Sequence, residues 1–223
     1  MRILINQISF LVLLIGFLFP KISLGQSDLD SKRIMSIGIK SGASTSSLMI
    51  GIPIQKINAP ILPSYGLIFS YLDKKIVGIQ LEVNFLSKQW EENPIGDYNF
   101  NSTLNYIEIP MLTSLHFGNK FKFLINFGPY LSFLINEQSS HTIGQESEYY
   151  PYYHERIPKN ADFGLSAGAG FRFQSRIGIF QAEGRYTFGF QNLYDPEKSN
   201  LDYSNMQTIS ATISYQFVIF NGR

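Results

Sequence analysis

Residues Asp162 to Phe173 read D-F-G-L-S-A-G-A-G-F-R-F, and this stretch decides the fold. Its odd-numbered residues are phenylalanine, leucine or alanine, whereas its even-numbered residues are glycine, serine, aspartate or arginine. Successive side chains of a β-strand point to opposite faces of the sheet. The stretch therefore predicts a strand that separates an apolar face from a face of small and charged residues.

The same alternation occurs in eight segments of the chain. We expect strands near residues 33–44, 64–72, 76–87, 104–117, 121–135, 162–173, 177–190 and 205–220. Short turns (73–75, 118–120 and 174–176) alternate with long polar connections (45–63, 88–103, 136–160 and 191–204). An even strand number with tight turns at one end and long loops at the other is typical of outer-membrane barrels. The sequence predicts an all-β protein: an eight-stranded antiparallel up-and-down transmembrane β-barrel with short periplasmic turns and long extracellular loops.

Side-chain volume decides which face points outward. A secreted eight-stranded barrel could instead turn its apolar face inward around a ligand. The interior of an eight-stranded barrel is only just wide enough for its side chains, and roughly five large apolar residues per strand would not fit there. The face rich in glycine and serine would fit. We therefore expect the apolar side chains to contact lipid.

The composition and the N-terminus support an exported membrane protein. Charged residues are only 16% of the 223 residues, against about a quarter in typical soluble domains. The formal net charge is +1, which offers no basic field for nucleic acid, and there is no cysteine. An apolar run from Ile8 to Phe19 is followed by small residues at Ser23 and Gly25, so we expect a signal peptide cleaved between Gly25 and Gln26. The expected organisation is a signal peptide (1–25), a lead (26–32), the barrel domain (33–220) and a tail (221–223).

The inward face carries four basic and four acidic residues. An unpaired charge in a narrow lumen would cost several kcal/mol, so we expect these groups to neutralise one another and to close the lumen. The alternative is a selectivity filter in a narrow channel. The expected structural network consists of Lys40, Glu82, Glu108, Lys122, Asp162, Arg172, Glu183 and Arg185.

Few residues suggest chemistry. His116 and Ser114 share the inward face, and His141 and His154 lie in a long loop, but no spacing defines a catalytic or metal site. We expect no enzyme activity, no cofactor and no metal. A candidate contact patch for a protein partner, or a belt at the membrane interface, lies in the same loop: Tyr149, Tyr150, Tyr152 and Tyr153.

Four motifs resemble the PorT-like outer-membrane β-barrel family of Bacteroidetes. They are L-N-Y-I-E-I-P-M-L (104–112), N-F-G-P-Y-L (126–131), D-F-G-L-S-A-G-A-G (162–170) and E-G-R-Y-T-F-G-F-Q-N-L (183–193). The resemblance implies a barrel in the cell outer membrane, surrounded by lipid. We expect a non-enzymatic structural or interaction module. Two alternatives are an accessory part of a type IX-like secretion apparatus, in which the founding member of the family takes part, and a narrow small-solute channel.

Overall fold

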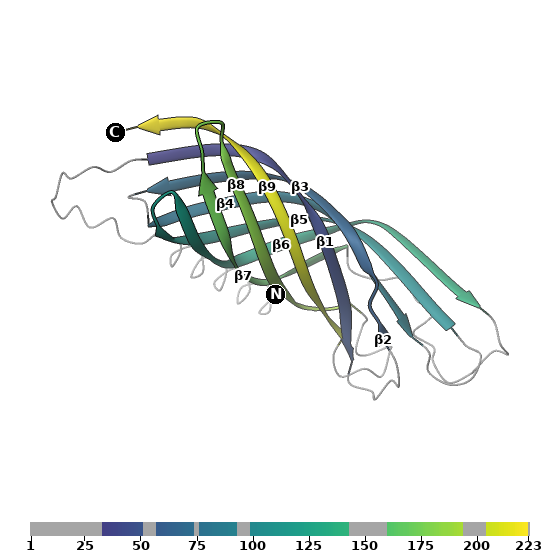
Figure 1. Cartoon of the computed structure of the whole chain (residues 1–223). Helices are drawn as coiled ribbons and strands as arrows, with labels where there is room; N and C mark the ends of the chain where they lie inside the picture. Colours follow the sequence, from purple (N-terminus) through teal and green to yellow (C-terminus); the bar gives the residue numbers. More distant parts are fainter. Residues whose placement is uncertain are drawn as a thin grey trace, which may run out of the picture. The chain divides into compact units, whose positions relative to one another are not determined.

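The computed structural model describes residues 33–50, 57–73, 76–92, 99–142, 160–193 and 204–222. This part of the chain contains β1 (Arg33–Ile50), β2 (Ile57–Asn58), β3 (Ile61–Asp73), β4 (Val77–Glu92), β5 (Asn99–Gly118), β6 (Phe121–Thr142), β7 (Ala161–Gln174), β8 (Ile179–Asn192) and β9 (Ser204–Gly222) (Figure 1). All strands except β2 are long. Within these residues no helix is long and apolar enough to cross a membrane.

The eight long strands form one closed antiparallel ring. Strands that follow one another in sequence pair with each other, and pairing of β1 with β9 completes the circle. The predicted eight-stranded up-and-down barrel is confirmed. Following hydrogen-bonded partners once around the ring from Ile34 leads back to β1 at Ser44, a stagger of ten residues from position 34 to position 44. For eight strands this stagger corresponds to a tilt of the strands of roughly 40° from the barrel axis, which is typical of closed barrels.

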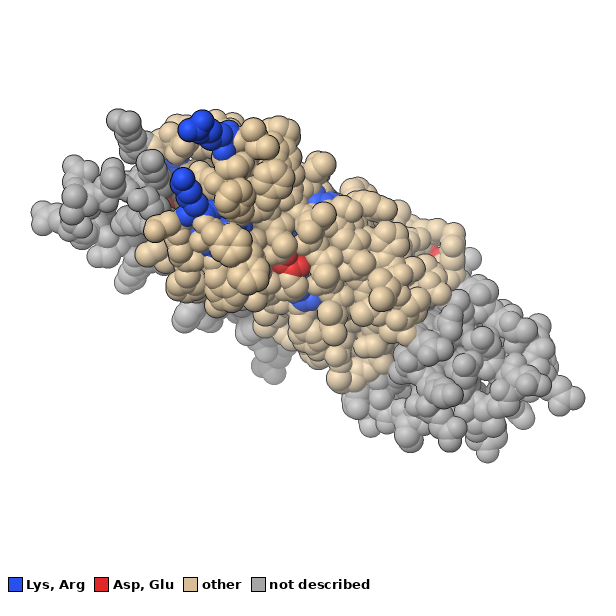
Figure 2. Space-filling model, in the orientation of Figure 1, with Lys and Arg blue, Asp and Glu red and all other residues tan. Residues whose placement is uncertain are grey.

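The apolar face points outward, as predicted from side-chain volume. Along β8 the side chains of Glu183 and Arg185 are buried inside the ring, while Phe180 and Tyr186 are 42% and 43% exposed. The face seen in Figure 2 carries only a few charged groups between its two ends. Large apolar side chains are exposed on all eight long strands, among them Ile39, Leu67, Phe85, Met111, Phe133, Phe171, Phe180 and Ile213.

Several strands are longer than the sequence pattern predicts, and all of the added length of β4, β5 and β6 lies at the loop end, apart from Gly118. The pairing of β5 with β6 continues to Asn99 and Thr142, whereas the pairing of β6 with β7 ends at Phe133 and Ala161. The alternation of apolar and polar residues fades there because most of the added residues are polar. The three strands therefore project beyond the rest of the ring as a polar sheet (Figure 1).

Two predicted boundaries at the turn end are corrected. β8 begins at Ile179 rather than Ile177, because Gly178 has a φ of +150° and belongs to the turn. β9 includes Asn221 and Gly222, which the sequence pattern predicts to be part of a tail. The reason is a bulge opposite Met35 and Ser36, which adds one residue to β9 and lets its pairing with β1 continue to Gly222.

Candidate functional site

The centre of the barrel lumen holds a cluster of ions built around Glu82 of β4. Both Glu82 oxygens accept hydrogen bonds from the Arg185 guanidinium of β8, at 2.8 Å each, and Oε2 also accepts one from Lys40 Nζ of β1 at 2.7 Å. Arg185 Nε and Nη2 donate to Glu183 Oε1 at 2.9 and 2.7 Å. All four side chains are at least 92% buried. Charge-assisted bonds in such surroundings are strong.

Amide side chains extend this cluster towards the turn end. Gln80 donates to Glu82, and Gln181 donates both to Glu183 Oε2 and to Gln80 Oε1 at 3.1 Å. Gln216 donates to Gln181, and the Ser36 hydroxyl donates to Gln216 at 2.8 Å. These bonds satisfy the polar groups that the strands turn inward, as buried polar groups require.

The resulting hydrogen-bonded system, here called the lumen network, includes at least one side chain from every long strand. Asn126 donates to Glu183 and links Ser114 to the centre, while Ser70 reaches Gln216. Arg172 donates to Ser36 at 3.4 Å. The members are Ser36, Lys40, Ser70, Gln80, Glu82, Asn84, Ser114, His116, Asn126, Arg172, Gln181, Glu183, Arg185, Ser214 and Gln216.

A second charged cluster lies towards the loop end. Lys88 Nζ of β4 is 3.9 Å from both Glu108 Oε2 and Asp162 Oδ2, and its side chain is 1% exposed. The ammonium also lies over the rings of Tyr106 and Tyr130, 4.9 and 5.7 Å from their centroids. Tyr130 donates from its hydroxyl to Asp162 at 2.8 Å. We call these five residues the lysine cluster.

Two glycines make room for the lysine cluster. Gly164 of β7 and Gly189 of β8 are cross-strand partners. A Cβ at Gly164 would collide with the Phe188 carbonyl oxygen and lie 2.8 Å from the Tyr130 ring, and one at Gly189 would lie 2.9 Å from the Asp162 carboxylate. The absence of side chains at these two positions therefore allows Tyr130 to lie against the wall of the barrel.

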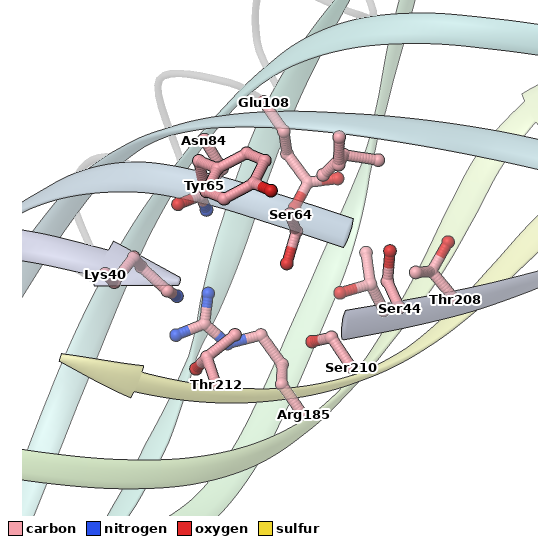
Figure 3. Close-up of a pocket in the computed structure, with 12 residues that line it drawn as sticks. Lys40, Ser44, Ser64, Tyr65, Asn84, Glu108, Arg185, Thr208, Ser210 and Thr212 are labelled. Atoms are coloured by element: carbon pink, nitrogen blue, oxygen red, sulfur yellow. The ribbon is translucent and has the colours of Figure 1, made fainter. Parts of the chain in front are cut away.

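A cavity of about 20 Å³ lies between the two clusters, lined by Lys40 and Arg185 from one and Glu108 from the other (Figure 3). Polar atoms without a hydrogen-bond partner among the described residues line it: Ser44 Oγ, Ser64 Oγ, Asn84 Oδ1 and Glu108 Oε2. Two hydroxyls and two acceptors are the partners that a water molecule uses, and the cavity is large enough for one.

Apolar side chains are also buried towards both ends of the described lumen. Ile34, Leu72 and Ile179 form a buried cluster at the turn end, each at most 4% exposed. At the loop end, Leu48, Leu104 and Met206 are buried to a similar degree. Buried apolar side chains therefore accompany the ions and amides towards both ends of the interior.

Ser114 and His116 are in contact, but their geometry differs from that of a catalytic pair. His116 Nε2 is 2.9 Å from Ser114 Oγ, while Ser114 donates to Asn126. His116 Nδ1 has no hydrogen-bond partner among the described residues, so no acid orients the imidazole. Both side chains are 2% exposed. In the described part of the chain, no group of three or more His, Cys, Asp or Glu side chains is arranged to hold a metal ion.

The eight charges expected to form one network are divided. Lys40, Glu82, Glu183, Arg185 and Arg172 belong to the lumen network, and Glu108 and Asp162 belong to the lysine cluster. Lys122 is buried next to its cross-strand partner Arg172. Lys88 was missed because it lies just past the predicted end of its strand, although its even number places it on the inward face with Glu82.

Other predicted features lie outside the described residues. These are the cleavage site at Gly25 and Gln26, the tyrosine patch at 149–153 and the loop residue His154.

The sequence matches the family described as outer membrane protein beta-barrel domain over residues 25–195. Among solved structures, the outer membrane protein OprG from Pseudomonas aeruginosa is 14% identical, with a TM-score of 0.50 over 84% of this chain and 96% of OprG. Ail of Yersinia pestis (13% identical, TM-score 0.39, 85% and 100% coverage) and Neisserial surface protein A (11%, 0.41, 81% and 97%) are more distant. No curated protein matches the sequence. Because the family match spans more than half of the chain, this protein belongs to the outer membrane protein β-barrel domain family and is located in the outer membrane.

Proposed function

We propose that this protein is a non-enzymatic structural and interaction module of the outer membrane whose lumen is closed by the lumen network. The observation that carries the proposal is the continuity of this network. Hydrogen bonds connect side chains of all eight long strands, and the ions in the centre are at least 92% buried. The cavity beside them has room for about one water molecule.

The arrangement of Ser114 and His116 supports the absence of catalysis by this pair. A general base must reach both its nucleophile and a group that orients it. The second nitrogen of His116 has no such partner among the described residues, and both side chains are buried. A substrate would have to unpack the barrel to reach the serine.

The projecting sheet of β4, β5 and β6 supports a role in interaction. Nine residues of β6, from position 134 to position 142, continue beyond its last pair with β7 at Phe133, which is roughly 30 Å of strand. This sheet carries the long loop that contains Tyr149, Tyr150, Tyr152 and Tyr153. Clustered tyrosines suit contacts with proteins because each ring combines an apolar body with a polar hydroxyl.

Two measurements test the proposal. In planar bilayers we expect the purified protein to give no conductance steps, and discrete steps would overturn the closed lumen in favour of a narrow channel. Affinity purification from native membranes should recover a partner with the wild type and lose it when the four tyrosines are changed to serine. A control with Tyr194→Ser and Tyr203→Ser in another long loop should retain the partner. Recovery of the lone barrel would refute the interaction role.

The resemblance to PorT-like barrels supports an accessory role in protein export as a second candidate. The closed lumen restricts that role, because an exported chain could not pass through a barrel interior filled by ions and amides. An export function would have to act through the loops or the projecting sheet. The same purification distinguishes the two candidates, since only the second predicts components of an export apparatus among the recovered proteins.

A further inference from the structure

Basic residues gather at the turn end of the barrel. Arg33 is the first residue of β1, Lys120 lies in the turn between β5 and β6, and Arg176 lies in the turn between β7 and β8. All three side chains are exposed. Figure 2 shows prominent blue groups at the end of the barrel where Figure 1 places the short turns. We call these three residues the basic rim.

Little acidic charge offsets the basic rim. Among the described residues of this end, Asp73 is the one acidic residue. Its Oδ1 atom lies 3.7 Å from Arg33 Nε. The two side chains are 39% and 61% exposed, so the pair is weak. Three basic residues and one acidic residue leave a net charge of +2, and the sequence adds Lys74 and Lys75 in the remaining turn.

The opposite end of the molecule has the reverse charge balance. The predicted long connections (45–63, 88–103, 136–160 and 191–204) contain ten acidic and five basic residues. One of the five is Lys88, which is buried in the lysine cluster. The positive charge of the turn end is therefore a local property of that end and not a consequence of a basic protein.

The basic rim lies at the edge of the lipid-facing surface. Lys120 is followed by Phe121, which is 60% exposed, and Arg176 is followed by Ile177, which is 71% exposed. A cation next to an exposed apolar side chain stands at the depth where hydrocarbon gives way to headgroups. The long stems of lysine and arginine allow the charge to extend from the apolar surface into that layer.

We propose that the basic rim binds the phosphate groups of anionic phospholipids in the periplasmic leaflet. The guanidinium groups of Arg33 and Arg176 can hold phosphate oxygens in pairs, and Lys120 supplies a point charge. Each basic residue close to an anionic membrane surface strengthens the attraction roughly fivefold. The ligand class is a phosphodiester lipid with a net negative headgroup, and a zwitterionic lipid offers the same phosphate with less attraction.

Native mass spectrometry of the barrel released from nanodiscs tests the proposal. The nanodiscs contain equal amounts of phosphatidylglycerol and phosphatidylethanolamine, and the retained lipids are counted. The test variant is Arg33→Gln, Lys120→Gln and Arg176→Gln. The control variant is Lys56→Gln, Arg156→Gln and Lys198→Gln, which removes the same charge from the long loops. We expect the wild type and the control to retain phosphatidylglycerol preferentially, and the test variant to lose this preference.

Three results would overturn the proposal. They are a wild type without preference, a test variant that keeps the preference, and equal losses in the two variants. If the test variant does not fold, the salt dependence of the wild type tests the proposal. Its preference for phosphatidylglycerol should be lower in about 0.5 M salt than in about 0.05 M salt, because a shorter Debye length weakens the attraction between exposed charges. Binding to purified cell-wall sacculi that depends on the basic rim, with an unchanged lipid preference, would assign the rim to the acidic cell wall instead.

Discussion

Replacing Glu82 by glutamine should lower the free energy of unfolding of the barrel by more than the loss of an exposed ion pair does. Glu82 accepts hydrogen bonds from Lys40, Arg185, Gln80 and Asn84, and its side chain is 1% exposed. Glutamine keeps the shape but removes the charge and one acceptor. Arg185 would keep Glu183 as its partner, whereas Lys40 would lose the carboxylate that it contacts at 2.7 Å.

The expected loss follows from the burial of the partners that remain. Removing one member of a buried ion pair costs about 3 to 5 kcal/mol, because the other charge stays in a medium that solvates it poorly. Asp73→Asn is the matched control, since it removes the same charge from a pair that is 39% and 61% exposed and should cost at most about 1 kcal/mol. The ratio of the two losses is a sharper prediction than either value.

Urea unfolding of the refolded protein in lipid vesicles, followed by the intrinsic fluorescence of the chain, measures both free energies. The double variant Lys40→Met with Glu82→Gln should recover part of the loss, because it removes the stranded ammonium together with the carboxylate. A Glu82→Gln variant within about 1 kcal/mol of Asp73→Asn would refute the reasoning. A double variant that is no more stable than Glu82→Gln would refute the role assigned to Lys40.

The same unfolding assay checks three further predictions. Gly164→Ala should cost about 1 to 3 kcal/mol through its collision with Phe188 and Tyr130, whereas Gly184→Ala, whose nearest neighbour atom is 4.0 Å away, should be neutral or slightly stabilising; equal effects would contradict this. Lys88→Met should destabilise the barrel by about 3 to 5 kcal/mol, and adding Glu108→Gln should reverse part of that loss; no recovery would count against the lysine cluster. Ile213→Arg, at a position that is 69% exposed, should cost about 2 to 4 kcal/mol in a bilayer, and an unchanged free energy would mean that this surface does not contact lipid.

The fold could be predicted because a membrane barrel imposes one simple rule on every strand. Lipid outside and a narrow interior inside force an alternation that even twelve residues, such as Asp162 to Phe173, reveal. The strand ends beyond the membrane could not be predicted in the same way. Near Asn99 and Thr142 the sequences of β5 and β6 are polar at most positions, so they show no alternation from which a strand could be recognised.

The content of the lumen could be predicted only in part. Which charged residues point inward follows from the alternation of side chains along each strand. Which of them pair with one another depends on the stagger of the ring, which brings together Glu82 and Arg185, 103 residues apart in the sequence. The inward apolar residues Leu124 and Tyr130 interrupt an otherwise polar face. Tyr130 is accommodated by glycines on β7 and β8, which the sequence of its own strand does not reveal.

The ring-wide hydrogen bonding has a consequence for biogenesis. Until β1 meets β9, the Glu82 carboxylate of β4 and the Arg185 guanidinium of β8 lie on strands of an open sheet that are separated by β5, β6 and β7. An open sheet entering the bilayer would expose these ions to hydrocarbon, where each is strongly unfavourable. Insertion and circularisation must therefore occur together, and a half-inserted intermediate would have to keep its polar face covered by water or by the assembly machinery.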